Sequence, residues 1–320
     1  MLRSISLCAA VLAASAVATP ALAAADYPAR SVTMVVAYPP GGSTDTAARL
    51  VAESLSKKLG RTFVVENRPG AGGTIGASLV ARSNPDGYTL LFGASAETSI
   101  APATMENIPF NIEKDFEPIS LVGKVPFLLV AYPGFPPNNV SELIKYAKEH
   151  PNEVNYSSFG NNTSNHLTGE LFNSLAGVKM THVPYKGSGP SITDLMGGQV
   201  QVSFDTVTAV LPLVQSGKLK ALGVTMLERS AMAPNVPTLD ESGIKGFTGG
   251  TWFGLLAPSG TPKEITAKLS KAVADVLDDP ALSKQFSDRG ITPAATTPEE
   301  FRSFIQSEIS KWKDLPKEPK

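Results

Sequence analysis

Cysteine is nearly absent from this sequence, and its absence excludes several kinds of chemistry. Cys8 is the one cysteine among 320 residues, and it lies in the N-terminal segment. The rest of the chain therefore has no thiol chemistry, no disulfide and no cysteine-ligated metal site. Such a chain folds on its hydrophobic core alone, and this one is long enough for two domains of ordinary size.

Charge of one sign, long apolar runs and histidine are also scarce. The formal net charge is −1 at pH 7, so nothing directs the chain to nucleic acid or to an acidic lipid surface. No run beyond the N-terminal segment is long enough to predict a membrane-spanning helix. The histidines are His150, His166 and His182, and their spacing suggests no metal site.

Motifs of enzymes and nucleotide-binding proteins are missing as well. The sequence has no G-x-S-x-G, no H-E-x-x-H and no G-x-x-x-x-G-K-[ST]. Residues 70–76, GAGGTIG, resemble a dinucleotide loop, but their spacing is G-x-G-x-x-x-G. Asp86, Glu97, Asp115 and Asp240 could pair for acid–base catalysis, but scattered carboxylates are typical of surface charge. We therefore expect a protein that is not an enzyme and needs no cofactor or metal.

The N-terminus has the three parts of an export signal. Arg3 supplies the basic region, residues 5–17 are apolar, and Ala21-Leu22-Ala23 is a small-x-small cleavage site. The apolar run is too short to span a bilayer. We expect cleavage near Ala23 and a periplasmic mature chain; the alternative is a fixed N-terminal anchor.

A glycine turn joins a strand to a helix in residues 32–49, VTMVVAYPPGGSTDTAAR. The apolar, β-branched run 32–38 predicts a buried strand, which the PPGG turn at 39–42 ends. The STD sequence at 43–45 can cap the helix that follows. Strand, glycine turn and helix together point free backbone N–H groups at a ligand, and a helix N-terminus favours an anion. We interpret this loop as half of a clamp for a small carboxylate.

Strands and helices alternate along most of the chain, which predicts an α/β fold with parallel sheets and right-handed crossovers. Ligands of such sheets bind at the carboxyl ends of the strands, where residues 40–45 and 94–97 fall. In the first set we expect strands at 32–38, 62–67 and 88–92. In the second we expect strands at 154–158, 180–184, 200–204 and 221–225 and helices at 140–149, 164–175, 190–196 and 207–215.

Two apolar segments predict crossings between two lobes. Residues 119–132 leave the first lobe, and residues 252–257 return to it. Two similar lobes joined in this way suggest a hinge with the ligand between them. The expected division is 1–23 as signal peptide, 24–122 with 240–320 as a discontinuous first lobe, and 123–239 as the second lobe. The closing helices, which pack back on the first lobe, are expected at 263–277, 280–289 and 298–315.

The second lobe has its own donor-rich turns. Residues 156–166, YSSFGNNTSNH, run from a strand into a helix and are dense in hydroxyls and amides, which can replace the water around a carboxylate. The alternative is an ordinary capped helix start. In the next turn Tyr185 is either a cleft wall or a rim aromatic, and Lys186 is either a counter-ion or a solvated lysine.

Asp205 ends another predicted strand of the second lobe and precedes a helix. It is either a helix cap or an acceptor for a ligand ammonium or hydroxyl group. A carboxylate beside a bound carboxylate repels it unless such a group intervenes.

Five motifs resemble one known family in their order along the chain. They are YPPGGSTDTAARL, VVENRPGAGGTIGA, PDGYTLLF, NYSSFGNNTSNHLTGELF and VPYKGSGPSITDLMGGQVQVSFD. These are similar to motifs of the Bug (Bordetella uptake gene) family, the periplasmic substrate-binding components of tripartite tricarboxylate transporters. The resemblance covers nearly the whole chain after the export signal. It implies a two-lobe periplasmic binding protein (Venus flytrap) fold of class α/β, with two parallel-type sheets joined by crossing strands.

The resemblance also implies a carboxylated ligand held by strand–helix loops of both lobes. The second loop here, FGNNTSNH, is more amide-rich than the glycine–serine version expected of the family. Carried over position by position, the ligand-binding residues are Tyr38, Gly41, Gly42, Ser43, Asp45, Ser95, Ser158, Gly160, Asn161, Asn162, Thr163, His166, Gly187 and Asp205.

The leading hypothesis is thus a monomeric periplasmic solute-binding protein for a di- or tricarboxylate, an aromatic acid or an amino acid. Its partner is the membrane permease of a tripartite tricarboxylate transporter. Two alternatives stay open: an exported hydrolase or lyase that uses a cleft carboxylate with His166, and a sensor that presents the acid to a membrane kinase.

Overall fold

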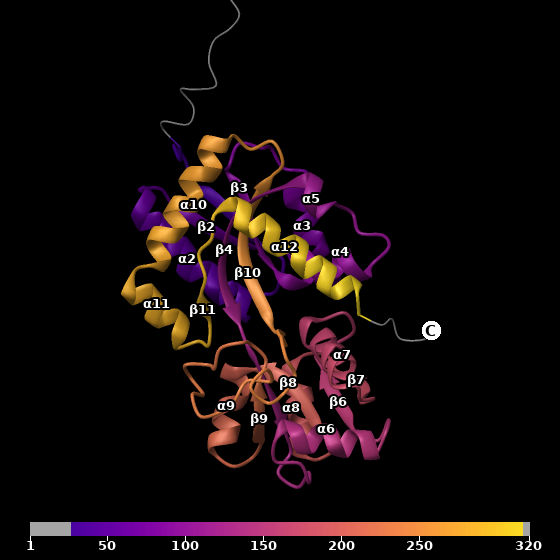
Figure 1. The fold of residues 1–320 in the computed structure, drawn as a ribbon. Coiled ribbons are helices and arrows are strands. Elements are labelled where there is room, and N and C mark those ends of the chain that lie inside the picture. The colour runs from indigo at the N-terminus through magenta and orange to yellow at the C-terminus, as the bar shows by residue number, and fades with distance from the viewer. Residues whose placement is uncertain (1–26, 316–320) are drawn as a thin grey trace, which may run out of the picture.

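The computed structural model describes residues 27–315. The predicted export signal lies outside these residues. Two α/β bodies are stacked end to end in Figure 1, and each is built on its own sheet. We call the body with the first sheet the first lobe (residues 27–125 and 251–315) and the body with the second sheet the second lobe (residues 127–250).

Six strands of the described chain form the first sheet, in the order β11-β4-β10-β3-β1-β2. β1 pairs in parallel with β2 and β3, whereas β10 is antiparallel to both β3 and β4. The strands are β1 (Val32–Val36), β2 (Phe63–Asn67), β3 (Thr89–Ala94), β4 (Phe116–Val125), β10 (Thr251–Pro258) and β11 (Thr292–Pro293).

The second sheet has the order β7-β6-β8-β5-β9. β6 is parallel to β7 and β8, and β5 is antiparallel to β8 and β9. Its strands are β5 (Phe127–Ala131), β6 (Asn155–Ser158), β7 (Thr181–Pro184), β8 (Val202–Thr206) and β9 (Lys220–Val224). The helices of this lobe are α6 (Val140–Glu149), α7 (Ser164–Ala176), α8 (Ser188–Met196) and α9 (Val207–Gln215).

Both sheets are therefore mixed, not parallel throughout as the alternation of strands and helices suggested. The reason is the return of the chain. β4 leaves the first sheet toward the second lobe, and β10 comes back beside it, so the two strands must run in opposite directions. The predicted two-lobe α/β fold is otherwise confirmed.

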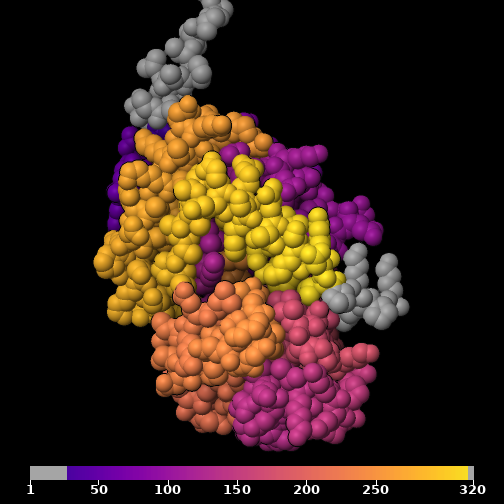
Figure 2. Space-filling model, in the orientation of Figure 1, coloured from indigo at the N-terminus to yellow at the C-terminus, as the bar shows by residue number. Residues whose placement is uncertain are grey.

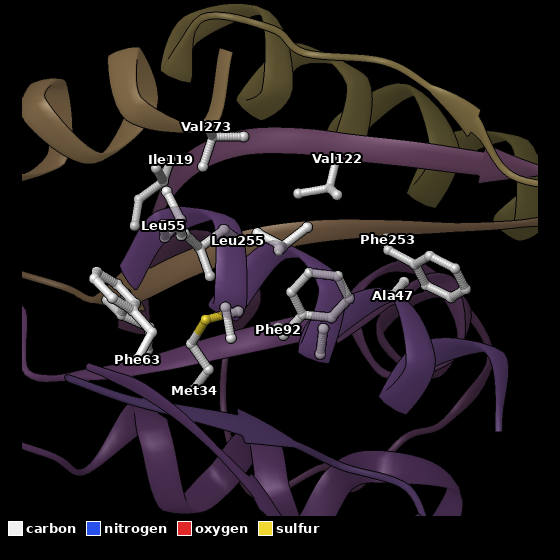
Figure 3. Close-up of a cluster of buried hydrophobic side chains, with 14 of the residues drawn as sticks. Met34, Ala47, Leu55, Phe63, Phe92, Ile119, Val122, Phe253, Leu255 and Val273 are labelled. Atoms are coloured by element: carbon white, nitrogen blue, oxygen red, sulfur yellow. The ribbon is translucent and has the colours of Figure 1, made fainter. Parts of the chain in front are cut away.

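Alternate residues of the first-sheet strands enter two different cores, because successive side chains of a strand point to opposite faces. Met34 belongs to a cluster with Leu55 of α2 (Ser43–Leu59) and Val273 of α10 (Lys263–Leu277), shown in Figure 3. Val35 belongs to the cluster on the other face, with residues of α3 (Thr74–Ala81) and α12 (Pro298–Lys313). α11 (Pro280–Ser287) completes the first face.

The outward crossing is short and the return crossing is long. Pro126 alone separates β4 from β5, since proline cannot continue a ladder. The return runs from Val224 to Thr251, and Leu239 and Phe247 on the way pack into the second-lobe core. These contacts place the return crossing nearer to residues 249–250 than to the division at 239/240 that the sequence suggested.

Several elements had no counterpart in the sequence prediction, because most are too short to show a hydrophobic period and the continuous helical segment 96–104, AETSIAPAT, consists mainly of small and polar residues. They are η1 (Ala71–Gly73), η2 (Ala96–Ile100), α4 (Ala101–Thr104), α5 (Ile112–Asp115) and β11. Within residues 27–315, every helix is too short or too polar to cross a lipid bilayer.

A close approach in the first sheet leads to a stability prediction. A Cβ added to Gly254 in β10 would lie 2.1 Å from Cζ of Phe301 in α12, and the Phe301 ring is fully buried. We expect Gly254→Ala to lower the free energy of unfolding by about 1–3 kcal/mol, because the ring or the strand must shift. Urea unfolding measures this change.

The matched control is Gly189→Ala in α8, where an added Cβ meets nothing within 4 Å. We expect this change to be neutral or to stabilise the protein by up to about 1 kcal/mol, because alanine loses less backbone entropy in a helix. Equal effects of the two substitutions would contradict the packing argument.

Candidate functional site

The first-lobe turn after β1 lies open to solvent. Residues 39–43 are exposed, whereas Asp45 is buried just behind them. An added Cβ at Gly41 would meet nothing within 4 Å, and one at Gly42 would meet only the carbonyl oxygen of Pro39, at 3.9 Å. Gly41 has φ +88°, a backbone conformation that favours glycine. The predicted glycine loop is thus present, with free space beside its backbone.

Asp45 holds this turn in place from inside. Its Oδ2 accepts hydrogen bonds from the Gly41 backbone N–H at 2.9 Å and from Arg49 Nε at 3.0 Å, and its Oδ1 accepts one from Asn67 Nδ2 at 2.8 Å. Asn67 also donates to the Tyr38 carbonyl. Although burial raises the pKa of Asp45, the bonds from Arg49, Gly41 and Asn67 hold it below the ordinary value.

The carboxylate of Asp45 is therefore engaged within its own lobe. This arrangement also neutralises Arg49, which forms an ion pair with Asp45 at 2.9 Å. The direct ligand contact expected for Asp45 stays a prediction. In the structure its side chain stabilises the turn through the bonds to Gly41 and Asn67.

Glu97 was interpreted from the sequence as a scattered surface charge, and that interpretation is wrong. Its side chain is fully buried at the start of η2, where it accepts hydrogen bonds from the Tyr38 hydroxyl and from the Ala94 backbone N–H. The predicted site residue Ser95 is next to it, also fully buried, with its Oγ 2.9 Å from Oγ1 of Thr251. No local sequence signal distinguishes Glu97 from an exposed glutamate.

The second-lobe loop is built over a pair of stacked histidines. His166 and His182 have ring centroids 3.8 Å apart. His182 Nε2 lies 2.5 Å from Ser158 Oγ, and His166 Nδ1 accepts the backbone N–H of Asn162 at 3.1 Å. Burial lowers the pKa of each histidine to about 4, with the mutual repulsion of the pair adding to the effect at His182. Both rings are therefore neutral at pH 7, and this loop has no imidazolium to offer.

The turn itself places amides and a hydroxyl at the N-terminus of α7. Asn161 and Asn162 are exposed, and Asn162 adopts φ +59°, which asparagine tolerates better than most residues. The Gly160 carbonyl accepts bonds from Ser158 Oγ and Thr163 Oγ1, so these hydroxyls shape the turn.

Asn165 is a residue of this loop that the sequence analysis missed. It is fully buried, and its Oδ1 accepts a hydrogen bond from Thr163 Oγ1 at 2.7 Å. Among the buried side-chain nitrogens of residues 27–315, Asn165 Nδ2 and His166 Nε2 are two that have no hydrogen-bond partner. Such groups are uncommon in folded proteins, and they leave unused hydrogen-bonding capacity at the start of α7.

The structure shows the contacts of the polar residues around the turn before α8, for which the sequence left two roles open. Tyr185 donates its hydroxyl to Asp194 at 2.8 Å, so it is tied to its own lobe. Gly187 has φ +107° and faces open space. Asp205 is fully buried and accepts bonds from Ser188 Oγ at 2.7 Å and from the Thr206 N–H at 2.6 Å. Burial raises the pKa of Asp205 to about 6.

A helix cap does not explain Asp205, because Thr206 is the N-cap residue of α9 and Asp205 does not reach the N2 or N3 amide. Its carboxylate instead anchors the start of α8. Lys186 is exposed, which agrees with the interpretation of a solvated lysine.

The crossing segment lies beside both halves of this site. Thr251 bonds to Ser95 of the first lobe, and the neighbouring Gly250 N–H donates to Thr168 Oγ1 of α7 at 3.3 Å. Thr168 is one helical turn beyond Asn165, so both lie on the same side of α7. Figure 2 shows the lobes meeting at a narrowed junction, with α12 above it and the orange residues of the return segment below it.

Two surface concavities lie elsewhere. One, of about 900 Å³, lies between α10 and the start of α12, and the other lies between α2 and α11. Both are open to solvent and contain none of the predicted ligand-binding residues. Within residues 27–315 no cluster of three histidine, cysteine or acidic residues could hold a metal ion.

Two sheets joined by two crossings, with glycine-rich turns at the strand ends of both lobes, define a two-lobed solute-binding protein. Residues 47–319 match the Tripartite tricarboxylate transporter family receptor, TctC, and the chain belongs to this family.

Three similar proteins illustrate the relationship. Protein BugT of Bordetella pertussis is 38% identical over 319 residues, which are 99% of this chain and 98% of BugT. The structure of Rpa4515 from R. palustris with adipate is 35% identical, with a TM-score of 0.79 over 91% of this chain and 97% of the other. MatC from Rhodopseudomonas palustris with bound malate is 37% identical, with a TM-score of 0.76 over 90% of this chain and 99% of the other.

The family confirms the predicted class of function. The protein is a periplasmic solute-binding receptor of the TctC type and not an enzyme, so the hydrolase alternative is wrong. His166 fits this result, since it is neutral and its Nδ1 already accepts a backbone N–H.

The Asp45 network predicts a pH-dependent contribution to stability. We expect Asp45→Asn to lower the free energy of unfolding by roughly 2 kcal/mol at pH 7, because hydrogen bonds to a buried carboxylate are lost. The pKa of Asp45 is lowered in the folded state, so its contribution is complete above the unfolded pKa and is lost as the pH falls through the folded value. Urea unfolding of both proteins from pH 7 down to about pH 2 measures the difference, because the loss lies below the ordinary pKa of aspartate.

Glu53→Gln is the control on the same helix. Glu53 pairs with Lys57, but its side chain is 65% exposed. We expect a much smaller change than for Asp45→Asn, because solvent screens exposed ion pairs. A loss as large as that of Asp45→Asn would show that burial is not what makes the Asp45 network strong.

Proposed function

We propose that this protein captures a small organic carboxylate between its lobes and delivers it to the membrane permease of a tripartite tricarboxylate transporter. One observation carries the proposal: the strand-end turns of both lobes offer uncharged donors next to glycines that face open space. The relatives with bound adipate and malate support the ligand class.

The start of α7 is the stronger anion-binding half. Free backbone N–H groups and the helix dipole favour a negative group there. The exposed side chains of Asn161 and Asn162 add amide donors, and Asn165 Nδ2 is a buried donor without a partner in this structure. A small shift of the turn on binding brings that donor into use.

The first-lobe half holds the rest of the ligand through backbone groups of the turn at 39–43. Proposed direct contacts are Gly41, Gly42, Ser43, Ser158, Gly160, Asn161, Asn162, Thr163 and Gly187, with Tyr38, Ser95 and His166 lining the site. Asp45 and Asp205 support the turns and do not contact the ligand directly. The oxygens of Asp45 accept hydrogen bonds from Gly41, Arg49 and Asn67. Those of Asp205 accept hydrogen bonds from Ser188 and Thr206.

Neutral donors suit a carrier. An arginine fork would bind a carboxylate by two charge-assisted bonds. Amide and hydroxyl groups bind it more weakly and release it faster, as delivery to a permease requires. Export by a signal peptide cleaved near Ala23, and the permease as partner, belong to the same proposal; it needs no cofactor.

A melting screen tests the ligand class. A ligand at about 100 times its dissociation constant stabilises the fold by about 2.7 kcal/mol, which is a shift of roughly 5–10 °C for a protein of this size. The panel contains di- and tricarboxylates including malate and adipate, aromatic acids, nicotinate and amino acids. No shift with any acid would refute carboxylate binding.

A substitution of Gly42 tests the site. Gly42 has φ −75°, so a side chain fits there without backbone strain, and it would project into the open space beside the turn. We expect Gly42→Val to weaken binding of the best acid at least tenfold, because the side chain blocks approach to the backbone, while the unliganded melting temperature stays within about 2 °C. Calorimetric titration measures the affinity.

The control is Gly197→Val at the far end of α8, where φ is −79° and the residue is exposed. Its affinity should match that of the unmodified protein. Unchanged affinity of Gly42→Val would place the ligand elsewhere.

A further inference from the structure

Glu97 lies where three strand-end connections of the first lobe meet. Its carboxyl group accepts the Tyr38 hydroxyl after β1 and the Ala94 N–H at the end of β3. Gly73, the last residue of η1, packs so closely that an added Cβ would lie 2.9 Å from Glu97 Oε2. Glu97 therefore ties the turns after β1, β2 and β3 to one another.

No cation balances this buried carboxyl group among the described residues packed against it. Tyr38, which follows β1, is its titratable neighbour; η1 and β3 present Gly73 and Ala94, and α4 has no titratable side chain. α12 also packs on η2, but its Glu308 and Lys311 are paired with each other. The backbone N–H of Glu97 itself also favours the charged form, but without a counter-ion these hydrogen bonds do not offset the burial of the carboxylate.

Glu97 is close enough to the proposed site for its charge to affect the binding of an anionic ligand. Tyr38, which it holds, and Ser95, two residues before it, are both in the proposed site. A bound carboxylate at these strand ends repels an ionised Glu97 through protein of low dielectric constant, and the repulsion disappears if Glu97 is neutral.

Resting on the proposed function, we propose that Glu97 is a positioning residue that takes up one proton from solvent when the anionic ligand enters. In the complex a neutral carboxylic acid then lies behind Tyr38, and the turns keep their hydrogen bonds without a second negative charge. Burial raises the pKa of Glu97 to about 7 in the unliganded protein, so the proton is available near neutral pH.

Calorimetric titration in two buffers of different ionisation enthalpy counts the protons taken up. The probe is the acid with the largest shift in the melting screen, and dicarboxylates such as malate and adipate are essentially fully ionised at pH 7 and above. We expect uptake of about 0.5 proton at pH 7 and about 0.9 at pH 8, with the dissociation constant rising roughly 15-fold between pH 7 and pH 8.5.

Three variants separate Glu97 from other groups. Glu97→Gln should bind the acid with no proton uptake and with an affinity that changes less than twofold from pH 6.5 to pH 8.5. Glu142→Gln, an exposed carboxylate of α6, should behave as the unmodified protein does. Asp205→Asn tests the competing explanation that Asp205, which is also buried, takes up the proton. Loss of proton uptake in this variant and not in Glu97→Gln would overturn the proposal.

A measurement without ligand separates this inference from the proposed function. In protein with ¹³C-labelled glutamate side chains, the signal missing from Glu97→Gln reports the titration of Glu97 itself. Titration near pH 7 supports the inference, and titration below about pH 5 overturns it even if carboxylates bind. If no acid in the screen binds, the proposed function fails and the coupled uptake fails with it.

Discussion

The antiparallel pairing of β4 with β10 is the constraint on which the arrangement of this protein depends. β4 carries the chain out of the first sheet and β10 carries it back, so the two lobes are joined at the middle of a sheet. β3 lies next to β10, which brings the end of β3, with Ser95 and Glu97, beside the crossing. The return segment touches α7 through Gly250 and Thr168, so the second-lobe turn adjoins the same place.

A second contact between the lobes lies at the end of α12. Trp312 of α12 and Ile100 of η2 are buried in the hydrophobic cluster of the second lobe. The helix that closes the chain therefore covers the first sheet with one part and contacts the second lobe with the other, as its position in Figure 1 shows. Relative motion of the lobes must change these apolar contacts as well as the two crossings.

Three basic side chains beside the turns of the proposed site are paired or neutral. Arg49 is neutralised by Asp45, and His166 and His182 are neutral because they are buried together. The two buried carboxyl groups, Glu97 and Asp205, have raised pKa values for the same reason. Binding thus depends on dipoles of the backbone, amides and hydroxyls, whose positions are held by the network behind them.

Much of the fold followed from local pattern. The helices α6, α9 and α10 begin and end where the apolar period predicted, and the outward crossing at Pro126 lies within the apolar segment 119–132; residues 252–257, predicted as the return crossing, belong to β10 of the first sheet. The glycine turn after β1 and the amide-rich turn before α7 were also found, because strand, turn and helix leave a readable sequence. The antiparallel direction of β10, the helical segment of η2 and α4, and the two-residue strand β11 were not, since pairing direction, a run of small and polar residues, and a two-residue strand have no apolar period.

The sequence by itself determined the class of protein, the two lobes and the exposed donor turns, because these depend on residue type and spacing along the chain. Only the tertiary structure decided what lies behind those turns: Asp45 engaged by Arg49 and Asn67, Glu97 buried under Tyr38, Asn165 without a partner for its amide. Burial and charge compensation depend on residues far apart in sequence, so no local pattern distinguishes a glutamate in the interior from one at the surface.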